Sequence, residues 1–223
     1  MERGSRYPVS VWAPFGARDR LKRVVEAEQP RGIMLRSEPA WRTYGLSRVE
    51  AAKVRARRRA ELQRRRAEGE LLDTQDAVIA WGVRQELRAR GWDREWPAAP
   101  EAAWDQGKWP GSRDGGFAEK ISVRLDWLLV ERTVAACWET SREAIEALRR
   151  WRDEHPGLVT PRSRPDKEGR EQLVGPLAEY ERLSAQVTTP GQIWRGGLER
   201  GLAHAAASVR EAGTAAGGSG DTE

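Results

Sequence analysis

Arginine is the side chain whose type and spacing in this sequence most clearly indicate a chemistry, the binding of phosphate groups. The segment "KVRARRRAELQRRR", from Lys53 to Arg66, contains eight basic residues, and Glu61 is its only acid. Basic side chains on a helix bind the phosphate backbone of nucleic acids without reading its sequence. We therefore predict DNA backbone contacts here, and the alternative is a solvated helix face. The residues expected to make these contacts are Arg55, Arg58, Arg59, Arg65 and Arg66.

A second candidate for DNA recognition is the stretch "VAACWETSREAI" at residues 134–145. Its small residues are expected to end a first helix, and Trp138, Glu139 and Thr140 to form a turn. Thr140 or Ser141 would then cap a second helix with one apolar and one polar side, as a recognition helix requires. The apolar side has Ile145, Leu148 and Trp151. The side chains expected to contact DNA are Ser141, Arg142, Glu146, Arg149 and Arg150.

The stretch "AACWETSREAI" is similar in spacing to the helix-turn-helix of bacterial winged-helix regulators of the MarR and GntR types. Downstream, "GLVTPR", "SRPDKEGRE" and "QLVGP" look like the first strand, the tip and the return strand of a wing. The resemblance covers about residues 128–184. It implies a winged-helix DNA-binding domain, and on its wing it implies DNA contacts from Arg162, Arg164, Lys167 and Arg170.

Residues 120–125 offer an alternative way of reading DNA. Apolar and polar side chains alternate there, which predicts a strand. A strand followed by two helices resembles the ribbon-helix-helix family, in which strands paired between two chains enter the major groove. The side chains that would then contact bases are Lys120, Ser122 and Arg124. An ordinary helical hairpin without DNA-binding function remains a further alternative for residues 134–151.

Enzyme chemistry has little support in the residues that usually carry it. His155 precedes Pro156 in an expected loop, and His204 lies in a helix with several glycines. The single cysteine, Cys137, follows an apolar stretch and is expected in the core. No spacing of His, Cys or Asp matches a metal site. We therefore predict no catalytic residue, no metal, no cofactor and no small-molecule ligand.

The elements that must position the basic residues are mainly helical. A strand is expected in "RYPVSVWAPFG", and a short helix in "ARDRLKRVVEAEQ", ended by Pro30 and Gly32. Ser47 and Glu50 form a capping box, which begins the arginine-rich helix that stops at Gly69. Another helix is expected from about residue 73 to Gly91, and a last helix after "TTPGQ".

The predicted fold class is mainly α, with a helical N-terminal half and a C-terminal winged-helix-like domain that has a short β-wing. The tryptophans at positions 92, 96, 104 and 109 would stack on bases or bind a partner, and the alternative is that they fill gaps between two domains. The predicted segments are a mixed segment (1–45), a basic helical hairpin (46–92), a connector rich in Trp, Pro and Gly (93–116), a winged helix-turn-helix domain (117–186), a C-terminal helix (187–211) and a disordered tail (212–223).

Composition and charge bear on the partner and the compartment. The net charge of +5 and the isoelectric point of about 9.8 suit a polyanionic partner. There is no apolar run near 18 residues, so no transmembrane helix is expected, and no secretory signal is evident. With a single cysteine, these features predict a cytoplasmic protein.

Two functions from different classes follow from these features. The first is a DNA-binding protein that acts by binding rather than catalysis, a bacterial or mobile-element transcriptional or DNA-maintenance factor. Its expected partner is double-stranded DNA, with a homodimer as a possibility and no membrane. The second is a helical structural or interaction protein of a phage or plasmid, because "RRRAELQRRRAEGELLDTQDAVIAWG" has some similarity to the linker helices of phage small terminase subunits.

Overall fold

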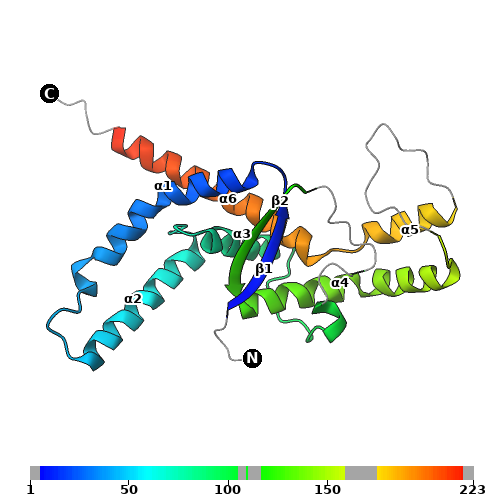
Figure 1. The fold of residues 1–223 in the computed structure, drawn as a ribbon, viewed down its shortest axis with the longest axis horizontal. Helices are drawn as coiled ribbons and strands as arrows, with labels where there is room; N and C mark the ends of the chain where they lie inside the picture. The colour runs from blue at the N-terminus through cyan, green and yellow to red at the C-terminus, as the bar shows by residue number, and fades with distance from the viewer. Residues whose placement is uncertain (1–5, 105–108, 110–116, 159–174, 218–223) are drawn as a thin grey trace. The chain divides into compact units, whose positions relative to one another are not determined.

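The computed structural model describes residues 6–104, 109, 117–158 and 175–217, with the backbone alone at residues 209 and 211–217. This part of the chain is mainly helical, with six α-helices and one two-stranded sheet (Figure 1). The predicted mainly α class is therefore confirmed. The chain divides into two compact units, each discontinuous in sequence. We call them the sheet unit (Met1–Phe15 and Leu87–Arg195) and the helical unit (Gly16–Glu86 and Gly196–Glu223).

The sheet unit is built on two strands that lie far apart in the sequence. β1 (Arg6–Ala13) pairs antiparallel with β2 (Glu119–Asp126), and Val9 lies opposite Val123. Every second residue of β2 is buried, as expected for a strand with one face on a core. The strands predicted in "RYPVSVWAPFG" and at residues 120–125 are confirmed. The buried residues of the sheet are Val9, Val11, Ala13, Ile121, Val123 and Leu125.

α4 (Trp127–Glu154) is one uninterrupted helix of 28 residues that follows β2 directly. Asp126 caps its N-terminus, because the Asp126 side chain accepts a hydrogen bond from the backbone N–H of Leu128 at 3.0 Å. The turn predicted at residues 138–140 is therefore wrong, and with it the helix-turn-helix arrangement of residues 134–151. The helical hairpin considered as the alternative is absent for the same reason.

Three observations explain why the helix continues through the predicted turn. Buried residues recur every three or four positions from Val130 to Trp151, so one face of α4 packs on the core along its whole length. Thr140 does not cap a second helix, because its hydroxyl donates to the carbonyl oxygen of Ala136 at 2.8 Å. A turn with positive φ favours glycine, and position 139 holds glutamate.

The C-terminal half of α4 is held by the segment that follows it in the fold. α5 (Pro176–Ala185) places the backbone oxygen of Pro176 2.9 Å from the indole nitrogen of Trp151, which donates a hydrogen bond to it. The same indole lies 4.8 Å from the ring of Tyr180, measured between centroids. This packing buries one side of the helix expected to read DNA and leaves the opposite side exposed.

Tryptophans of the predicted connector pack on other aromatic rings of the sheet unit. Trp104 ends η2 (Glu101–Trp104) and stacks on Trp127 with a centroid distance of 4.8 Å. Trp109 is buried and meets Trp138 edge-on at 5.6 Å. Trp104 and Trp109 therefore pack on aromatic rings of the same unit.

The helical unit consists mainly of helices. Their first residues lie close to the positions predicted from the sequence. α1 continues past Pro30 and Gly32, so the end predicted for it there is wrong. A Cβ atom at Gly32 would lie 2.5 Å from Oδ2 of Asp73, so glycine here allows a close approach of another segment. The elements are α1 (Ala17–Ser37), η1 (Pro39–Trp41), α2 (Arg48–Glu68), α3 (Gln75–Ala89) up to residue 86 and α6 (Pro190–Gly217) from residue 196.

α6 continues beyond the predicted helix into the segment that the sequence predicts to be disordered. Its last helical residue is Gly217, so the prediction of disorder is wrong for residues 212–217. Three of these six residues are alanine, the strongest helix former. Residues 218–223 lie outside the described residues.

Glycines bring α3 and α6 into backbone contact within the helical unit. A Cβ atom at Gly82 would lie 1.8 Å from the carbonyl oxygen of Gly197, and one at Gly201 would lie 2.3 Å from that of Val78. The glycines that weaken α6 as an isolated helix therefore allow it to pack closely on α3. The buried apolar side chains around this contact are Val78, Ile79, Val83, Leu198 and Leu202.

Replacing Gly82 with alanine is expected to lower the free energy of unfolding by about 2 kcal/mol, because the added methyl group meets backbone and the helices must separate. Urea unfolding followed by circular dichroism measures this change. Gly45→Ala is the control, because a Cβ there meets nothing within 4 Å and only the φ of +79° is unfavourable, at about 1 kcal/mol. A destabilisation by Gly82→Ala no larger than that of the control would contradict the close approach of α3 to α6.

Candidate nucleic-acid interface

α2 is a solvent-exposed helix with well-defined ends. The Ser47 hydroxyl accepts a hydrogen bond from the backbone N–H of Glu50 at 3.3 Å, and the Glu50 carboxylate accepts one from the backbone N–H of Ser47 at 3.0 Å. These bonds with Ser47 lower the pKa of Glu50. The helix ends at Gly69, whose φ is 84°. The predicted capping box and the predicted end are therefore confirmed.

The N-terminal two-thirds of α2, residues 48–60, is called the arginine segment below. Ala51 is the only buried residue of α2, so the segment is solvated around most of its circumference. In Figure 1, α2 extends away from α3 and α6. The segment has one acid, Glu50, which its capping box already engages. Its six basic residues form no ion pair with any described residue: Arg48, Lys53, Arg55, Arg57, Arg58 and Arg59.

The last turns of α2 differ, because their arginines bind carboxylates of the protein itself. Arg64 donates to Glu61 at 2.9 Å and also pairs with Glu68, and Arg65 donates to Glu61 at 2.7 Å. Hydrogen bonds from Arg64 and Arg65 lower the pKa of Glu61 to about 2. Arg65, predicted to contact phosphate, is thus engaged in an ion pair in this structure.

Arg66, also predicted to contact phosphate, binds the buried carboxylate of Asp73. Its Nε atom lies 2.8 Å from Oδ1 of Asp73 and its Nη2 atom 3.0 Å from Oδ2. Arg36 of α1 donates to Oδ2 from another direction at 2.9 Å. Only 1% of the Asp73 side chain is exposed, so this carboxylate links α1, α2 and the start of α3. From the sequence, Asp73 is predicted only to lie near the start of a helix.

Of the five residues on α4 that were predicted to contact DNA, one is buried and four are exposed. Ser141 is fully buried, and its hydroxyl accepts a hydrogen bond from the backbone N–H of Thr188 at 2.9 Å. Its predicted roles as a helix cap and DNA contact are therefore wrong, because it lies mid-helix on the buried face. The other four residues lie on the exposed face, as predicted: Arg142, Glu146, Arg149 and Arg150.

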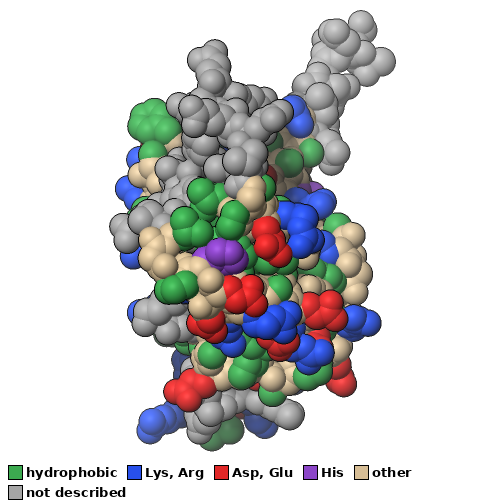
Figure 2. All heavy atoms as spheres, turned by 90° about the vertical axis from the view of Figure 1, so that its right-hand side faces the viewer, with side chains coloured by type: hydrophobic (Ala, Val, Ile, Leu, Met, Phe, Trp, Pro, Cys, Tyr) green, Lys and Arg blue, Asp and Glu red, His purple; other side chains and the backbone are tan. Residues whose placement is uncertain are grey.

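Charge is balanced rather than basic on this part of α4. Residues 138–154 contain five acids and four basic residues. Arg142 pairs with Glu139 at 3.3 Å, and Arg149 lies over the Trp138 ring at 5.8 Å. Figure 2 views the side on which α5 and the end of α4 lie in Figure 1, and basic and acidic side chains are intermingled there. On such a surface, repulsion between the acids and DNA phosphates offsets the attraction by the basic residues.

The remaining residues predicted to contact DNA belong to the predicted wing and to β2. Arg162, Arg164, Lys167 and Arg170 of the predicted wing lie outside the described residues. On β2, the side chains of Lys120, Ser122 and Arg124 are exposed. This strand pairs with β1 of the same chain and is followed by the single helix α4, whereas the ribbon-helix-helix pattern requires two helices.

The residues considered for catalysis take part in packing. Cys137 lies in the core, as predicted, and burial raises the pKa of its thiol. The ring of His155 stacks on Trp151 at 4.8 Å, and the ring of His204 stacks on Trp81 at 4.0 Å. Among the described residues, no group of three or more His, Cys, Asp or Glu side chains is placed to hold a metal ion.

Comparisons with known proteins identify no relative of this chain. No protein-family model, no curated protein and no solved structure matches the chain. Within the described residues, every helix is either too short or too polar to cross a lipid bilayer. The assignment of a function therefore depends on the geometry and charge of the chain itself.

Proposed function

We propose that this protein binds double-stranded DNA through the phosphate backbone and acts by binding rather than by catalysis. The interface is the arginine segment of α2, and the role is that of a transcriptional or DNA-maintenance factor. One observation carries the proposal: six basic side chains on one exposed stretch of helix have no carboxylate partner among the described residues. Protein surfaces commonly pair opposite charges, so an unpaired basic stretch suits a polyanion.

The dimensions of the arginine segment fit this partner. Its 13 residues span about 20 Å along the helix axis. Duplex DNA carries roughly twelve negative charges over that length, and its major groove is wide enough for an α-helix. The basic residues surround the helix, so several of them can meet phosphates on both sides of a groove.

A basic helix can also bind an anionic membrane, but that requires an apolar face that enters the lipid. Within the arginine segment, Val49 and Val54 are the only large apolar residues. The rest of the apolar residues there are alanines. This composition favours a polyanion in water, such as DNA, over a lipid surface.

A more specific version of the DNA-binding hypothesis is a winged-helix domain at residues 117–186. Its recognition helix would be the exposed face of α4, with the wing at residues 157–176 in addition. The missing turn and the balanced charge of residues 138–154 count against this form. The arginine segment therefore takes the main role in the proposal, and α4 is the alternative reader.

A second function is favoured by exposed apolar side chains where α1 meets α2. Tyr44 is fully exposed and Met34 is 72% exposed, and both lie close in sequence to the arginine segment. Exposed apolar clusters often mark protein interfaces. A helical interaction protein of a phage or plasmid, or a homodimer, would use such a surface. The exposed set is Ile33, Met34, Tyr44, Leu46 and Val49.

The proposal is tested by measuring the affinity of the protein for a random duplex of about 25 base pairs as a function of salt. Fluorescence anisotropy between about 0.05 and 0.4 M salt should give a line of log affinity against log salt. With four to six phosphate contacts its slope should be about −4 to −5, since each contact contributes about −0.9. The affinity should change little with DNA sequence. Absence of binding at the lowest salt would reject the proposal and favour the interaction protein.

A further inference from the structure

The two-stranded sheet has an outer face that the DNA-binding proposal does not use. β1 and β2 lie side by side (Figure 1), and residues paired across two strands project from the same face. Pro8 lies opposite Arg124, and Trp12 lies opposite Lys120. The residues of this face alternate with the buried ones, and all of them except the half-buried Ser10 are exposed. This ribbon face consists of Arg6, Pro8, Ser10, Trp12, Lys120, Ser122, Arg124 and Asp126.

The sheet has the dimensions of an element that enters the major groove of DNA. Paired strands are about 4.8 Å apart, and the major groove, roughly 12 Å wide, admits a two-stranded β-ribbon. Both strands are eight residues long, which corresponds to about 26 Å. The opposite face packs on the core through Val9, Val11 and Val123, so the ribbon face is held by a rigid support. A single chain supplies the whole ribbon, because both strands belong to it.

The charge of the ribbon face is complementary to DNA. Arg6, Lys120 and Arg124 are basic, and Asp126 is the one acid among its eight residues. The Asp126 carboxylate already accepts a hydrogen bond from the backbone N–H of Leu128, because it caps α4. The exposed side of α4 between residues 138 and 154 has balanced charge instead. A polyanion is therefore attracted to the sheet more strongly than to α4.

Lys120 and Arg124 occupy positions from which side chains reach base edges. Side chains on one face of a strand follow each other every two residues, so these two are about 13 Å apart along β2. This separation corresponds to about four base pairs, which rise about 3.4 Å each. Arginine and lysine both donate to O6 and N7 of guanine, the commonest specific contact in the major groove. Ser122 lies between them and opposite Ser10, and both side chains are short enough to let the backbone approach the bases.

We propose that the ribbon face enters the major groove and reads bases there, with Arg124 and Lys120 on two guanines about four base pairs apart. Trp12 supports this geometry, because the Lys120 Nζ atom lies 5.9 Å from the centroid of its ring. The inference rests on the proposed function, since DNA is the partner in both. It adds a sequence preference to the backbone contacts of the arginine segment. A site of this kind is rare in random duplexes, so backbone contacts govern their affinity.

The first test is the selection of binding sites by the full chain from duplexes with a randomised core of about 12 base pairs, just over one helical turn. We expect an enriched motif with two guanines about four base pairs apart. Its affinity should be at least roughly tenfold higher than that of random duplex. Equal affinity for all sequences, with random duplex still bound, would overturn the inference and leave the proposed function intact. Absence of binding to any duplex would reject both.

The second test locates Arg124 on a guanine. Arg124→Ala should lower affinity for the enriched site roughly tenfold or more, and affinity for random duplex less than about threefold, because it removes a base contact. Replacing the contacted guanine with 7-deazaguanine removes the N7 acceptor and should weaken binding of the unmodified protein by a similar factor. It should not weaken binding of Arg124→Ala further, because that contact is already lost.

Arg152→Ala is the matched control, because Arg152 is an exposed arginine in the last turn of α4 and is not part of the ribbon face. Its affinity for both DNAs should be unchanged. Circular dichroism verifies folding, and if Arg124→Ala unfolds, Arg124→Lys should lower affinity for the enriched site alone, since it keeps the charge and loses the bidentate contact. Equal losses on both DNAs, or additive effects of Arg124→Ala and 7-deazaguanine, would overturn the inference.

Discussion

Replacing Arg55, Arg58 and Arg59 together with glutamine is expected to weaken binding to random duplex DNA by about two to three orders of magnitude at 0.1 M salt. Each arginine that no longer neutralises a phosphate leaves about 0.9 counterion on the DNA. The slope of log affinity against log salt should therefore become less steep by roughly 2.7. Thermal stability should change little, because these side chains form no ion pair with any described residue.

The matched control for this variant lies on α4. Replacing Arg142, Arg149 and Arg150 with glutamine removes the same number of exposed arginines from the surface first predicted to read DNA. Fluorescence anisotropy across a salt series should show little change for this control. If the α4 variant instead binds DNA more weakly and the α2 variant does not, α4 is the reader and the assignment to the arginine segment is wrong.

Replacing Asp73 with alanine is expected to lower the free energy of unfolding by about 3–5 kcal/mol, because it leaves two guanidinium groups without their buried carboxylate. Arg36 and Arg66 donate three hydrogen bonds to this side chain, which is 1% exposed. The destabilisation should exceed that from removing any exposed ion pair in the same unit. Urea unfolding followed by circular dichroism measures it.

Glu199→Ala is the control for the effect of burial. Glu199 accepts two hydrogen bonds from Arg20, but half of its side chain is exposed. Solvent screens such a pair, so removing it should cost about 1 kcal/mol or less. Similar destabilisation by Asp73→Ala and Glu199→Ala would show that the Asp73 carboxylate does not hold α1, α2 and α3 together.

Local signals in the sequence were sufficient for several elements. The capping box at Ser47 and Glu50 and the end of α2 at Gly69 depend on residues within one or two helical turns of each other. The alternation in β2 and the exposed face of α4 follow from the periods of a strand and a helix. Such features are predictable because neighbouring residues alone determine them.

Features that depend on distant residues were decided by the tertiary structure. β1 and β2 are separated by more than a hundred residues, and their pairing gives β2 a partner within the chain. The local pattern of residues 138–140 suited a turn, but burial of one face along all of α4 keeps it a single helix. Packing against other segments outweighs weak local preferences of this kind.

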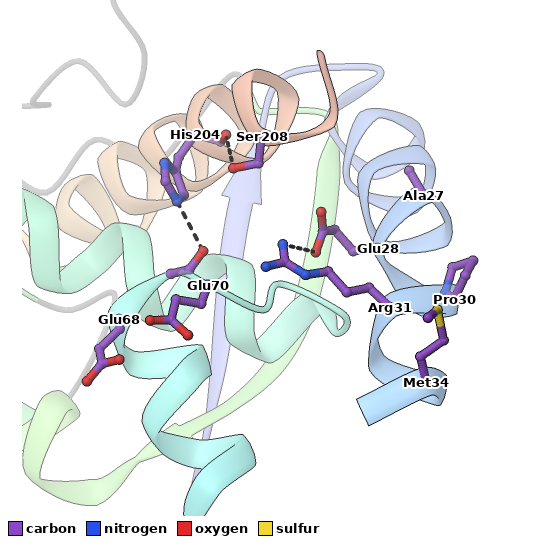
Figure 3. Close-up of a pocket in the computed structure, with 10 residues that line it drawn as sticks. Ala27, Glu28, Pro30, Arg31, Met34, Glu68, Glu70, His204 and Ser208 are labelled. Atoms are coloured by element: carbon purple, nitrogen blue, oxygen red, sulfur yellow. Dashed lines mark hydrogen bonds and ion pairs between the residues drawn. The ribbon is translucent and has the colours of Figure 1, made fainter. Parts of the chain in front are cut away.

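For the candidate site, the sequence by itself determined that the helix at 48–68 is basic, and only the tertiary structure decided which arginines remain available. Arg58 and Arg66 are indistinguishable in the sequence, yet Arg66 is bound by a carboxylate that the fold brings to it. Glu28 of α1 and His204 of α6 likewise line one cavity (Figure 3), although they lie far apart in the chain. Burial and ion pairing are properties of the folded arrangement, because they depend on which segments meet in space rather than on the order of residues.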